Sequence, residues 1–156
     1  MKKLLVLGVG NILLMDDGVG VWAVQELMKE EWPENVHFVD GGTATQDMFH
    51  ILEGYDSLLV LDVVHSKKEP GTISLFEESQ LVQNEKQRLS LHDIDLLDSL
   101  EMADMLGKRP QMRVLGMEPK SYTDWAMEMT EPCKAVFPQF VEEARKQIRK
   151  FLDEQL

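Results

Sequence analysis

The sequence is poor in cysteine and in basic residues, and long apolar runs are missing. Cys133 is the single cysteine and cannot form a disulfide within the chain, which favours a reducing compartment. Asp and Glu number 28 against 16 Lys and Arg, so the formal net charge is −12, and a surface of that sign repels nucleic-acid backbones and anionic lipid. No apolar segment approaches the roughly 20 residues needed to span a bilayer. We therefore expect neither a nucleic-acid nor a membrane partner.

The amino-terminal segment MKKLLVLGVGNILL has the lysines and the apolar run of a secretory signal but lacks its other features. Gly8, Gly10 and Asn11 interrupt the apolar run. Two acidic residues, Asp16 and Asp17, then follow where a small-residue cleavage site would be needed. The segment therefore predicts a buried first strand, and we expect the protein to be cytoplasmic.

The 156 residues have the composition of one ordinary globular domain, with 44% hydrophobic and 28% charged residues. Continuous apolar runs that end in Gly or Asp indicate strands covered on both faces, at 4–10, 36–40, 57–64 and 113–117. Apolar residues at helical spacing separate them, around 21–28, 94–100 and 141–152. The alternation predicts a single α/β domain, 1–156, a three-layer sandwich with a mostly parallel twisted sheet and helices on both faces.

One strand breaks this alternation. The run TISLFEE at 72–78 follows the third strand after only the connector HSKKEPG, which is too short for a crossover helix. We expect this strand to be antiparallel and near a sheet edge. Capping patterns predict two helix starts: Thr43 with Gln46, and Ser90 with Asp93, which puts His92 in the first turn of the second helix.

The segment GVGNILLMDDGVG at 8–20 resembles the start of a dinucleotide-binding fold, with Asp40 in the place of a ribose-binding acid. The fingerprint requires a third glycine, and the sequence has Leu13 there. Asp16 and Asp17 also add negative charge where a helix N-terminus would meet a pyrophosphate. Nucleotide binding therefore remains only an alternative.

Three chemically active residues follow different strands. Asp17 comes shortly after the first strand, Asp62 lies near the end of the third, and His92 follows the fourth. Since functional groups gather beyond the carboxyl ends of strands in open α/β sheets, we expect the three side chains at one rim. Two carboxylates and one imidazole suit Ni, Zn, Fe or Mn and leave coordination positions open. Each residue also has a plain structural explanation, as a helix N-cap, a strand-end turn residue and a solvated first-turn residue.

The other histidines and the cysteine are weaker candidates. His65 lies three residues after Asp62 and competes for the ligand role, but its polar turn predicts exposure. His37 falls within a strand and His50 on a helix, so both are expected to be structural. No cysteine-protease signature surrounds Cys133, which we do not expect to be a nucleophile.

Several blocks of the sequence together resemble one family, the hydrogenase maturation proteases, which are endopeptidases that finish the large subunit of nickel-iron hydrogenases. The blocks occur in the family's order and are LVLGVGNILLMDDGVG at 5–20, DGGT at 40–43, LLVLDVVHSKKEPGT at 58–72, SLHD at 90–93 and GMEP at 116–119. The resemblance implies that Asp17, Asp62 and His92 are the metal-binding and catalytic positions. Asp16 and Asp40 are candidates for supporting them. Some members of the family carry Glu where this chain has Asp17.

In proteins that this chain resembles, nickel arrives in the hydrogenase large-subunit precursor and is not a resident cofactor. The resemblance implies an endopeptidase that recognises this nickel and removes a C-terminal extension from the precursor. A non-enzymatic metal-handling or docking chaperone is the alternative of a different class. The match fades after 119, and the apolar residues Tyr122, Trp125, Met127 and Met129 are either a precursor-binding flap or core and dimer contacts.

Overall fold

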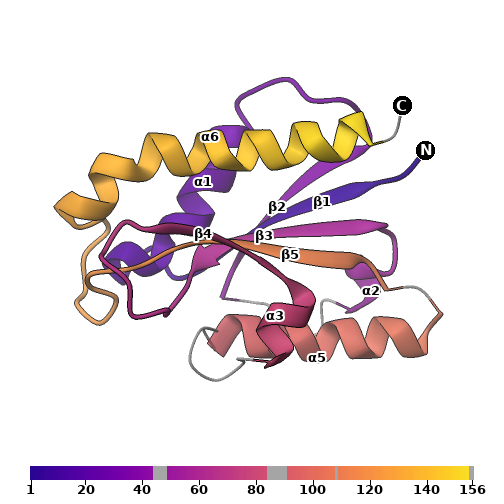
Figure 1. Ribbon diagram of the computed structural model, residues 1–156, viewed down its shortest axis with the longest axis horizontal. Helices are drawn as coiled ribbons and strands as arrows, with labels where there is room; N and C mark the ends of the chain where they lie inside the picture. The colour runs from indigo at the N-terminus through magenta and orange to yellow at the C-terminus, as the bar shows by residue number, and fades with distance from the viewer. Residues whose placement is uncertain (44–48, 84–90, 108, 155–156) are drawn as a thin grey trace.

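The protein was analysed as a computed structural model that describes residues 1–43, 49–83, 91–107 and 109–154. A five-stranded sheet in the order β2-β1-β3-β5-β4 forms its centre (Figure 1). The strands are β1 (Leu4–Val9), β2 (Val36–Gly42), β3 (Ser57–Val63), β4 (Ile73–Glu77) and β5 (Gln111–Met117). The helices are η1 (Met15–Gly18, a 3₁₀ turn), α1 (Val19–Leu27), α2 (Phe49–Leu52), α3 (Glu78–Gln83), α5 (Leu91–Met105) and α6 (Glu131–Asp153).

The sheet is mostly parallel, with one antiparallel strand at its edge. β1 pairs in parallel with both β2 and β3, and β3 pairs in parallel with β5. β4 runs antiparallel to β5, with Ile73 opposite Met117 and Glu77 opposite Arg113. Both the mixed sheet and the antiparallel edge strand were predicted, because the connector before β4 is too short for a crossover.

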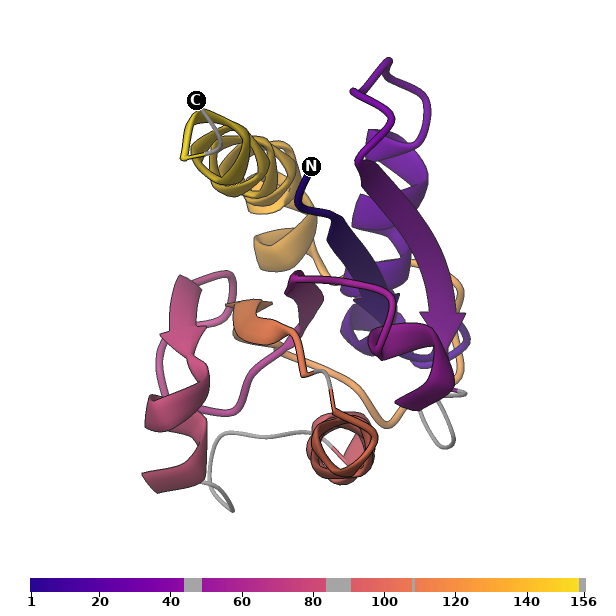
Figure 2. The same ribbon diagram turned by 90° about the vertical axis from the view of Figure 1, so that its right-hand side faces the viewer.

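Alternate residues of the strands build a separate core on each face of the sheet. Leu4 and Val6 of β1 face the core that α1 and α6 cover, whereas Leu5 and Leu7 face the core shared with α2 and α5. Figure 2 shows the sheet between these two layers, with α1 and α6 on one side and α5 on the other. The predicted sandwich with helices on both faces is therefore confirmed.

The helices contain the predicted apolar patterns and extend beyond some of them. α1 begins at Val19 and is preceded by η1, and α6 begins at Glu131, runs through the predicted 141–152 pattern and contains Pro138. α3 was not predicted at all. α5 begins at Leu91 as predicted, while the capping residues Gln46 and Ser90 lie outside the described residues. No helix among the described residues is long and apolar enough to cross a membrane.

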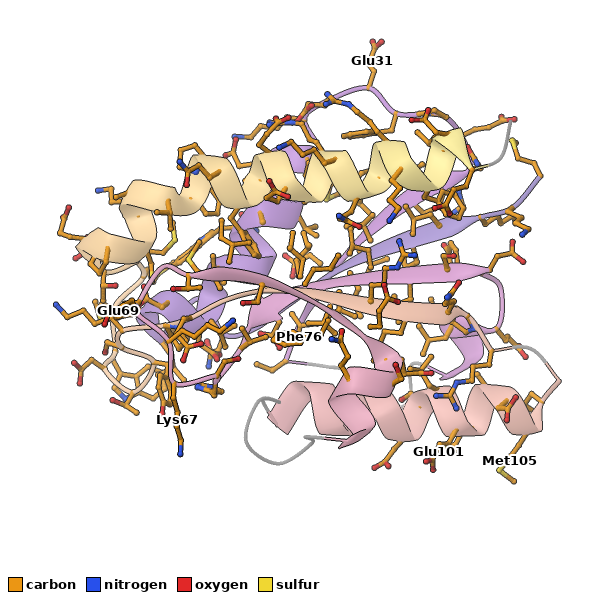
Figure 3. The ribbon with its side chains drawn as sticks, in the orientation of Figure 1. Glu31, Lys67, Glu69, Phe76, Glu101 and Met105 are labelled. Atoms are coloured by element: carbon orange, nitrogen blue, oxygen red, sulfur yellow. The ribbon has the colours of Figure 1, made fainter. Side chains whose placement is uncertain are left out.

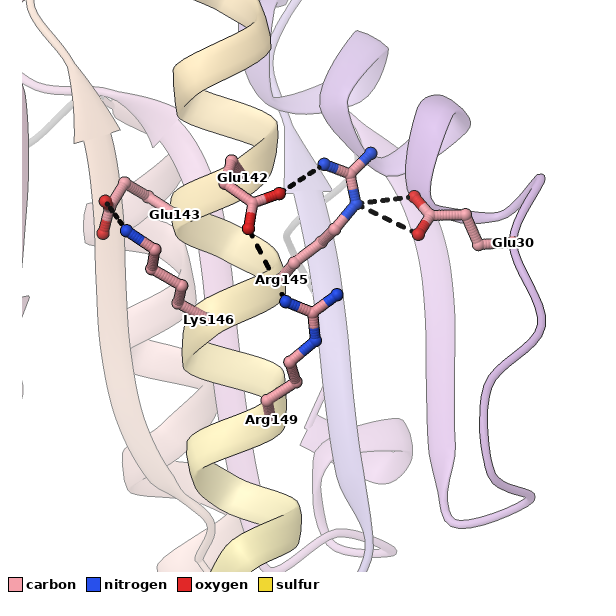
Figure 4. A network of polar contacts seen from close by, with 6 residues as sticks. All are labelled: Glu30, Glu142, Glu143, Arg145, Lys146 and Arg149. Carbon is pink, nitrogen blue, oxygen red and sulfur yellow. Dashed lines mark hydrogen bonds and ion pairs between the residues drawn. The ribbon is translucent and has the colours of Figure 1, made fainter.

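Ion pairs lie along the outer surface of α6 (Figure 4). Arg145 Nε donates to both carboxylate oxygens of Glu30, at 3.0 and 2.9 Å, and its Nη1 donates to Glu142 at 2.8 Å. Lys146 pairs with Glu143 one turn back along the same helix. Arg145 therefore connects α6 to the segment that follows α1, on the surface of the molecule.

Candidate active site

Two glycines bring the loop after β1 against the end of β3. Gly10 has a φ of +138°, and a Cβ on it would lie 1.9 Å from the carbonyl oxygen of Asp17. A Cβ on Gly20 would lie 1.8 Å from the carbonyl oxygen of Leu61. Only glycine permits these backbone approaches. As a result η1, which carries the two aspartates, contacts both α1 and β3.

Asp17 lies almost fully buried in η1, with its carboxylate turned back onto the loop. Its Oδ2 accepts a hydrogen bond of 2.8 Å from the backbone N–H of Asn11. The N-cap residue of α1 is Gly18. Through its bond to Asn11, the Asp17 carboxylate holds the turn that leaves β1.

Asp62 is fully buried near the carboxyl end of β3, where it stands beside Gly116 of β5. Its Oδ1 accepts a hydrogen bond of 2.8 Å from the N–H of Val63. Asp62 directly follows Leu61, the residue against which Gly20 packs. Asp17 and Asp62 therefore come from two segments in direct contact, η1 and β3.

The carboxylate of Asp16 accepts several hydrogen bonds at this rim. It is fully buried, and it accepts four hydrogen bonds: from the N–H groups of Lys120 and Ser121 at 2.9 and 3.1 Å, and from the N–H and hydroxyl of Thr130 at 2.8 and 2.7 Å. Burial opposes the charged form, but the hydrogen bonds from Ser121 and Thr130 outweigh it, so the pKa of Asp16 lies below its ordinary value. Asp16 thus ties η1 to both ends of the segment 120–130.

His92 is the second residue of α5, in the first turn as predicted. The amino-terminal end of α5 lies toward the side of the molecule at which β1 and β3 end (Figure 1). For residues 91–97 the structure describes the backbone alone. Among the described side chains, which exclude that of His92, no three His, Cys, Asp or Glu residues form a group that could hold a metal.

The competing histidines occupy different surroundings. His65 is partly buried, contrary to the expected exposure, because its ring meets the edge of Tyr122 with the ring centroids 4.9 Å apart. His37 is structural as predicted: Nδ1 lies 2.7 Å from the Tyr55 hydroxyl, and Nε2 lies 2.9 Å from a backbone carbonyl. The side chain of His50 lies outside the described residues.

Asp40 is exposed at the end of β2. Its Oδ1 accepts a hydrogen bond of 3.1 Å from the N–H of Gly42, whose φ is +51°, and its Oδ2 accepts one of 3.4 Å from Gln25 Nε2. These contacts hold the loop after β2 close to α1. The described contacts of Asp40 are therefore those of a residue that holds a loop.

Glu118 is a buried acid, directly after β5, that the sequence did not single out as a candidate. Its buried carboxylate accepts hydrogen bonds of 3.0–3.1 Å from the N–H of Ser66 and of 3.3 Å from that of Lys68, and so fixes the turn that begins at His65. The available signal was an acid directly after a buried strand, in GMEP. Nearby, burial raises the pKa of the Cys133 thiol to about 11, which excludes the thiolate needed of a nucleophile at neutral pH.

The protein is an open α/β sheet with buried acids near the carboxyl ends of its strands, and comparison with known proteins gives its family. The family model described as hydrogenase maturation protease matches residues 21–147. The chain is 33% identical over 152 residues to the hydrogenase expression/formation protein HupD of Rhizobium leguminosarum bv. viciae, covering 96% of this chain and 75% of that protein.

It is also 34% identical over 122 residues to the hydrogenase 2 maturation protease of Escherichia coli K12, covering 76% of this chain and 74% of the relative. Its fold is similar to that of the hydrogenase maturating endopeptidase HybD from E. coli, with a TM-score of 0.85 and 29% identity over 95% of this chain and 93% of the other.

The chain belongs to the hydrogenase maturation protease family. It is an endopeptidase that cleaves a hydrogenase large-subunit precursor.

Proposed function

We propose that Asp17, Asp62 and His92 recognise nickel carried by the large-subunit precursor, and that this contact places a peptide bond of its C-terminal extension for hydrolysis. The observation that carries the proposal is the burial of both carboxylates on segments in direct contact, η1 and β3. A carboxylate is costly to bury, so two at one rim favour a partner of positive charge. Nickel in this scheme is part of the substrate.

The donor set suits such a partner. Nickel accepts carboxylate oxygen and imidazole nitrogen, and three protein ligands leave positions for groups from the precursor. A site that completes the coordination of a metal already bound elsewhere distinguishes loaded from empty precursor. The position of His92 in the first turn of α5 supports its choice as the third ligand, because that end of α5 lies toward the carboxyl ends of the strands.

Holding the precursor at its nickel fixes the nearby peptide bond relative to the two acids. Such positioning contributes several kcal/mol to lowering a reaction barrier. The attacking water is activated either by Lewis-acid polarisation at the metal or by proton transfer to a carboxylate. Both routes require Asp17 and Asp62 ionised at the rim.

Asp16 and Asp40 act on the loops in this proposal. The four hydrogen bonds that Asp16 accepts fix η1, and with it the backbone of Asp17. Asp40 holds the loop after β2 through Gly42 and Gln25. Supporting contacts of this kind commonly set the orientation of residues that meet a metal.

Single substitutions test the three ligands. Asp17→Asn, Asp62→Asn and His92→Ala should each abolish processing of nickel-loaded precursor, with the far-ultraviolet circular dichroism unchanged. His65→Ala is the matched control, because it removes a neighbouring imidazole outside the proposed set, and it should process the precursor. An active His92→Ala beside an inactive His65→Ala would move the third ligand to His65.

A further inference from the structure

The segment 120–130 has little regular secondary structure, yet it is fixed firmly against the loop of η1. Beyond the four hydrogen bonds to the Asp16 carboxylate, the Asp16 N–H donates to the carbonyl of Ser121 at 3.1 Å. Ala126 donates to the carbonyl of Leu13 at 2.9 Å and accepts from the N–H of Met15 at 3.0 Å. The conformation of the segment is thus determined by the same loop that carries Asp17.

This fixed segment exposes large apolar side chains. Trp125 is 76% exposed and Met127 66%, and Tyr122 and Leu13 beside them are also exposed. Apolar groups of this size, held outward by a fixed backbone, mark interaction sites. We call these four residues the docking patch.

A groove continues the docking patch between α1 and the start of α6. Its apolar lining comes from Trp22, Met127, Met129 and Phe137. Glu26 and Glu128 add negative charge at its edge, and Lys134 adds one positive charge. The groove suits an extended peptide segment that presents apolar side chains together with a basic one.

We propose that the docking patch and this groove bind an apolar segment of the large-subunit precursor, beside the bond to be cleaved. The inference rests on the proposed function for the identity of the bond and of its nickel. The patch is joined by backbone hydrogen bonds to the loop that carries Asp16 and Asp17, so an occupant seated on it lies beside that loop. A second copy of the chain seated there would cover the rim that the substrate needs.

The opposite end of the molecule provides a comparison. Tyr122 of the docking patch packs against His65, which begins the turn that carries Lys67 and Glu69. Figure 3 shows Lys67 and Glu69 at one end of the molecule and Met105 at the other end. Met105 is 87% exposed, and Met102 on the same helix is also exposed. These two methionines match the patch in exposure but lie far from the rim.

The test compares two double variants: Trp125→Ser with Met127→Ser in the docking patch, and Met102→Ser with Met105→Ser as the control. The substrate is purified, nickel-loaded large-subunit precursor of a [NiFe] hydrogenase from the organism that encodes this chain. Trp is enriched among the few interface residues that carry most of the binding energy. We expect the patch variant to raise KM at least about tenfold with kcat within about threefold, and the control to leave both unchanged.

A binding measurement separates this inference from the ligand assignment. In the Asp17→Asn background, the Kd for the same precursor should rise at least about tenfold when the patch substitutions are added. Should Asp17→Asn still cleave, the ligand assignment fails while the Kd comparison continues to decide the docking patch. An unchanged KM and Kd in the patch variant would overturn the docking proposal. So would a wild-type dimer, seen by sedimentation, that the patch substitutions dissociate without a change in KM.

Discussion

The rim around Asp16 and the outer surface of α6 both hold charged groups in networks of hydrogen bonds, but they differ in burial. Asp16 is fully buried, and three of its four donors are backbone N–H groups from the segment 120–130. Arg145 on α6 makes three comparable bonds to Glu30 and Glu142 at a surface reached by water (Figure 4). The number of contacts is thus similar while the surroundings are not.

The difference shows where charge determines structure in this protein. Water replaces the partners of an exposed ion pair, so exposed pairs are worth only about 0–1 kcal/mol. Water cannot take the place of a lost partner in the interior. A buried carboxylate without its donors, or a buried donor without its carboxylate, therefore stays unsatisfied. We therefore expect the rim to be sensitive to substitution and the surface of α6 to be tolerant.

The largest effect on stability should come from Asp16→Ala. Removing the carboxylate leaves the N–H groups of Lys120, Ser121 and Thr130 without their acceptor, and we expect a loss of about 3–5 kcal/mol in the free energy of unfolding. Urea denaturation followed by circular dichroism measures it. Asp124→Ala is the matched control, because this exposed acid of the same segment accepts only a 3.5 Å bond from Ser121. Equal stability of the two variants would contradict the difference between rim and surface.

Gly20→Ala should come next. The added methyl group would lie 1.8 Å from the carbonyl oxygen of Leu61, which forces α1 away from β3 and shifts the two acids. Overpacking of this kind costs about 1–3 kcal/mol, and processing of the precursor should fall with it. In the control Gly54→Ala, the nearest atom is the carbonyl oxygen of Ile51 at 3.5 Å. A thermal melt should show a lowered midpoint for the first variant and little change for the second.

Acid should weaken the rim through Asp16. The folded protein holds the pKa of Asp16 below its ordinary value of 3.8, so the charged carboxylate contributes stability in full above that pH, and the contribution is lost as pH falls through the lower folded pKa. Asp16→Asn lacks this titration. Urea unfolding at pH 7, 4 and 3 should show the stability difference between wild type and Asp16→Asn narrowing as pH falls. If the stability difference between wild type and Asp16→Asn stayed constant with pH, the charge of Asp16 would not be its source.

Arg145→Ala should have the smallest effect. We expect less than about 1 kcal/mol, because Arg145 and its partners remain accessible to water. Added salt should reduce even this loss, since salt screens exposed charges. Urea denaturation at low salt and in 0.5 M sodium chloride measures the loss of stability and its dependence on salt. At the higher concentration the Debye length is roughly 4–5 Å. If Arg145→Ala lost as much free energy of unfolding as Asp16→Ala, burial would not explain the difference between the two networks.

The sequence predicted the sheet well, because buried parallel strands are continuous apolar runs and the connector before β4 is too short for a crossover. It failed at α3, which is only six residues long and follows β4 without a break. α6 begins at Glu131, where Pro132 occupies the first turn that tolerates proline, and it continues past an interior proline, Pro138.

In the site, features that depend on neighbouring residues could be predicted from the sequence, whereas contacts between distant residues could not. Asp17 and Asp62 lie near strand ends, which is a local feature of the sequence, so both could be chosen as candidates without the structure. The hydrogen bonds that Asp16 accepts could not be predicted, because their donors lie 104 to 114 residues further along the chain. Glu118 contacts Ser66 across 52 residues for the same reason. The joining of His92 to the two acids stays a prediction.

The central claim is that the rim senses nickel in the precursor, and one measurement tests it directly. Wild-type protein is mixed in excess with nickel-loaded precursor and, separately, with the same precursor prepared without nickel, and the shortened large subunit is followed by mass spectrometry. The account predicts rapid cleavage of the loaded precursor and no cleavage of the nickel-free one. Equal rates of cleavage for the two would contradict it.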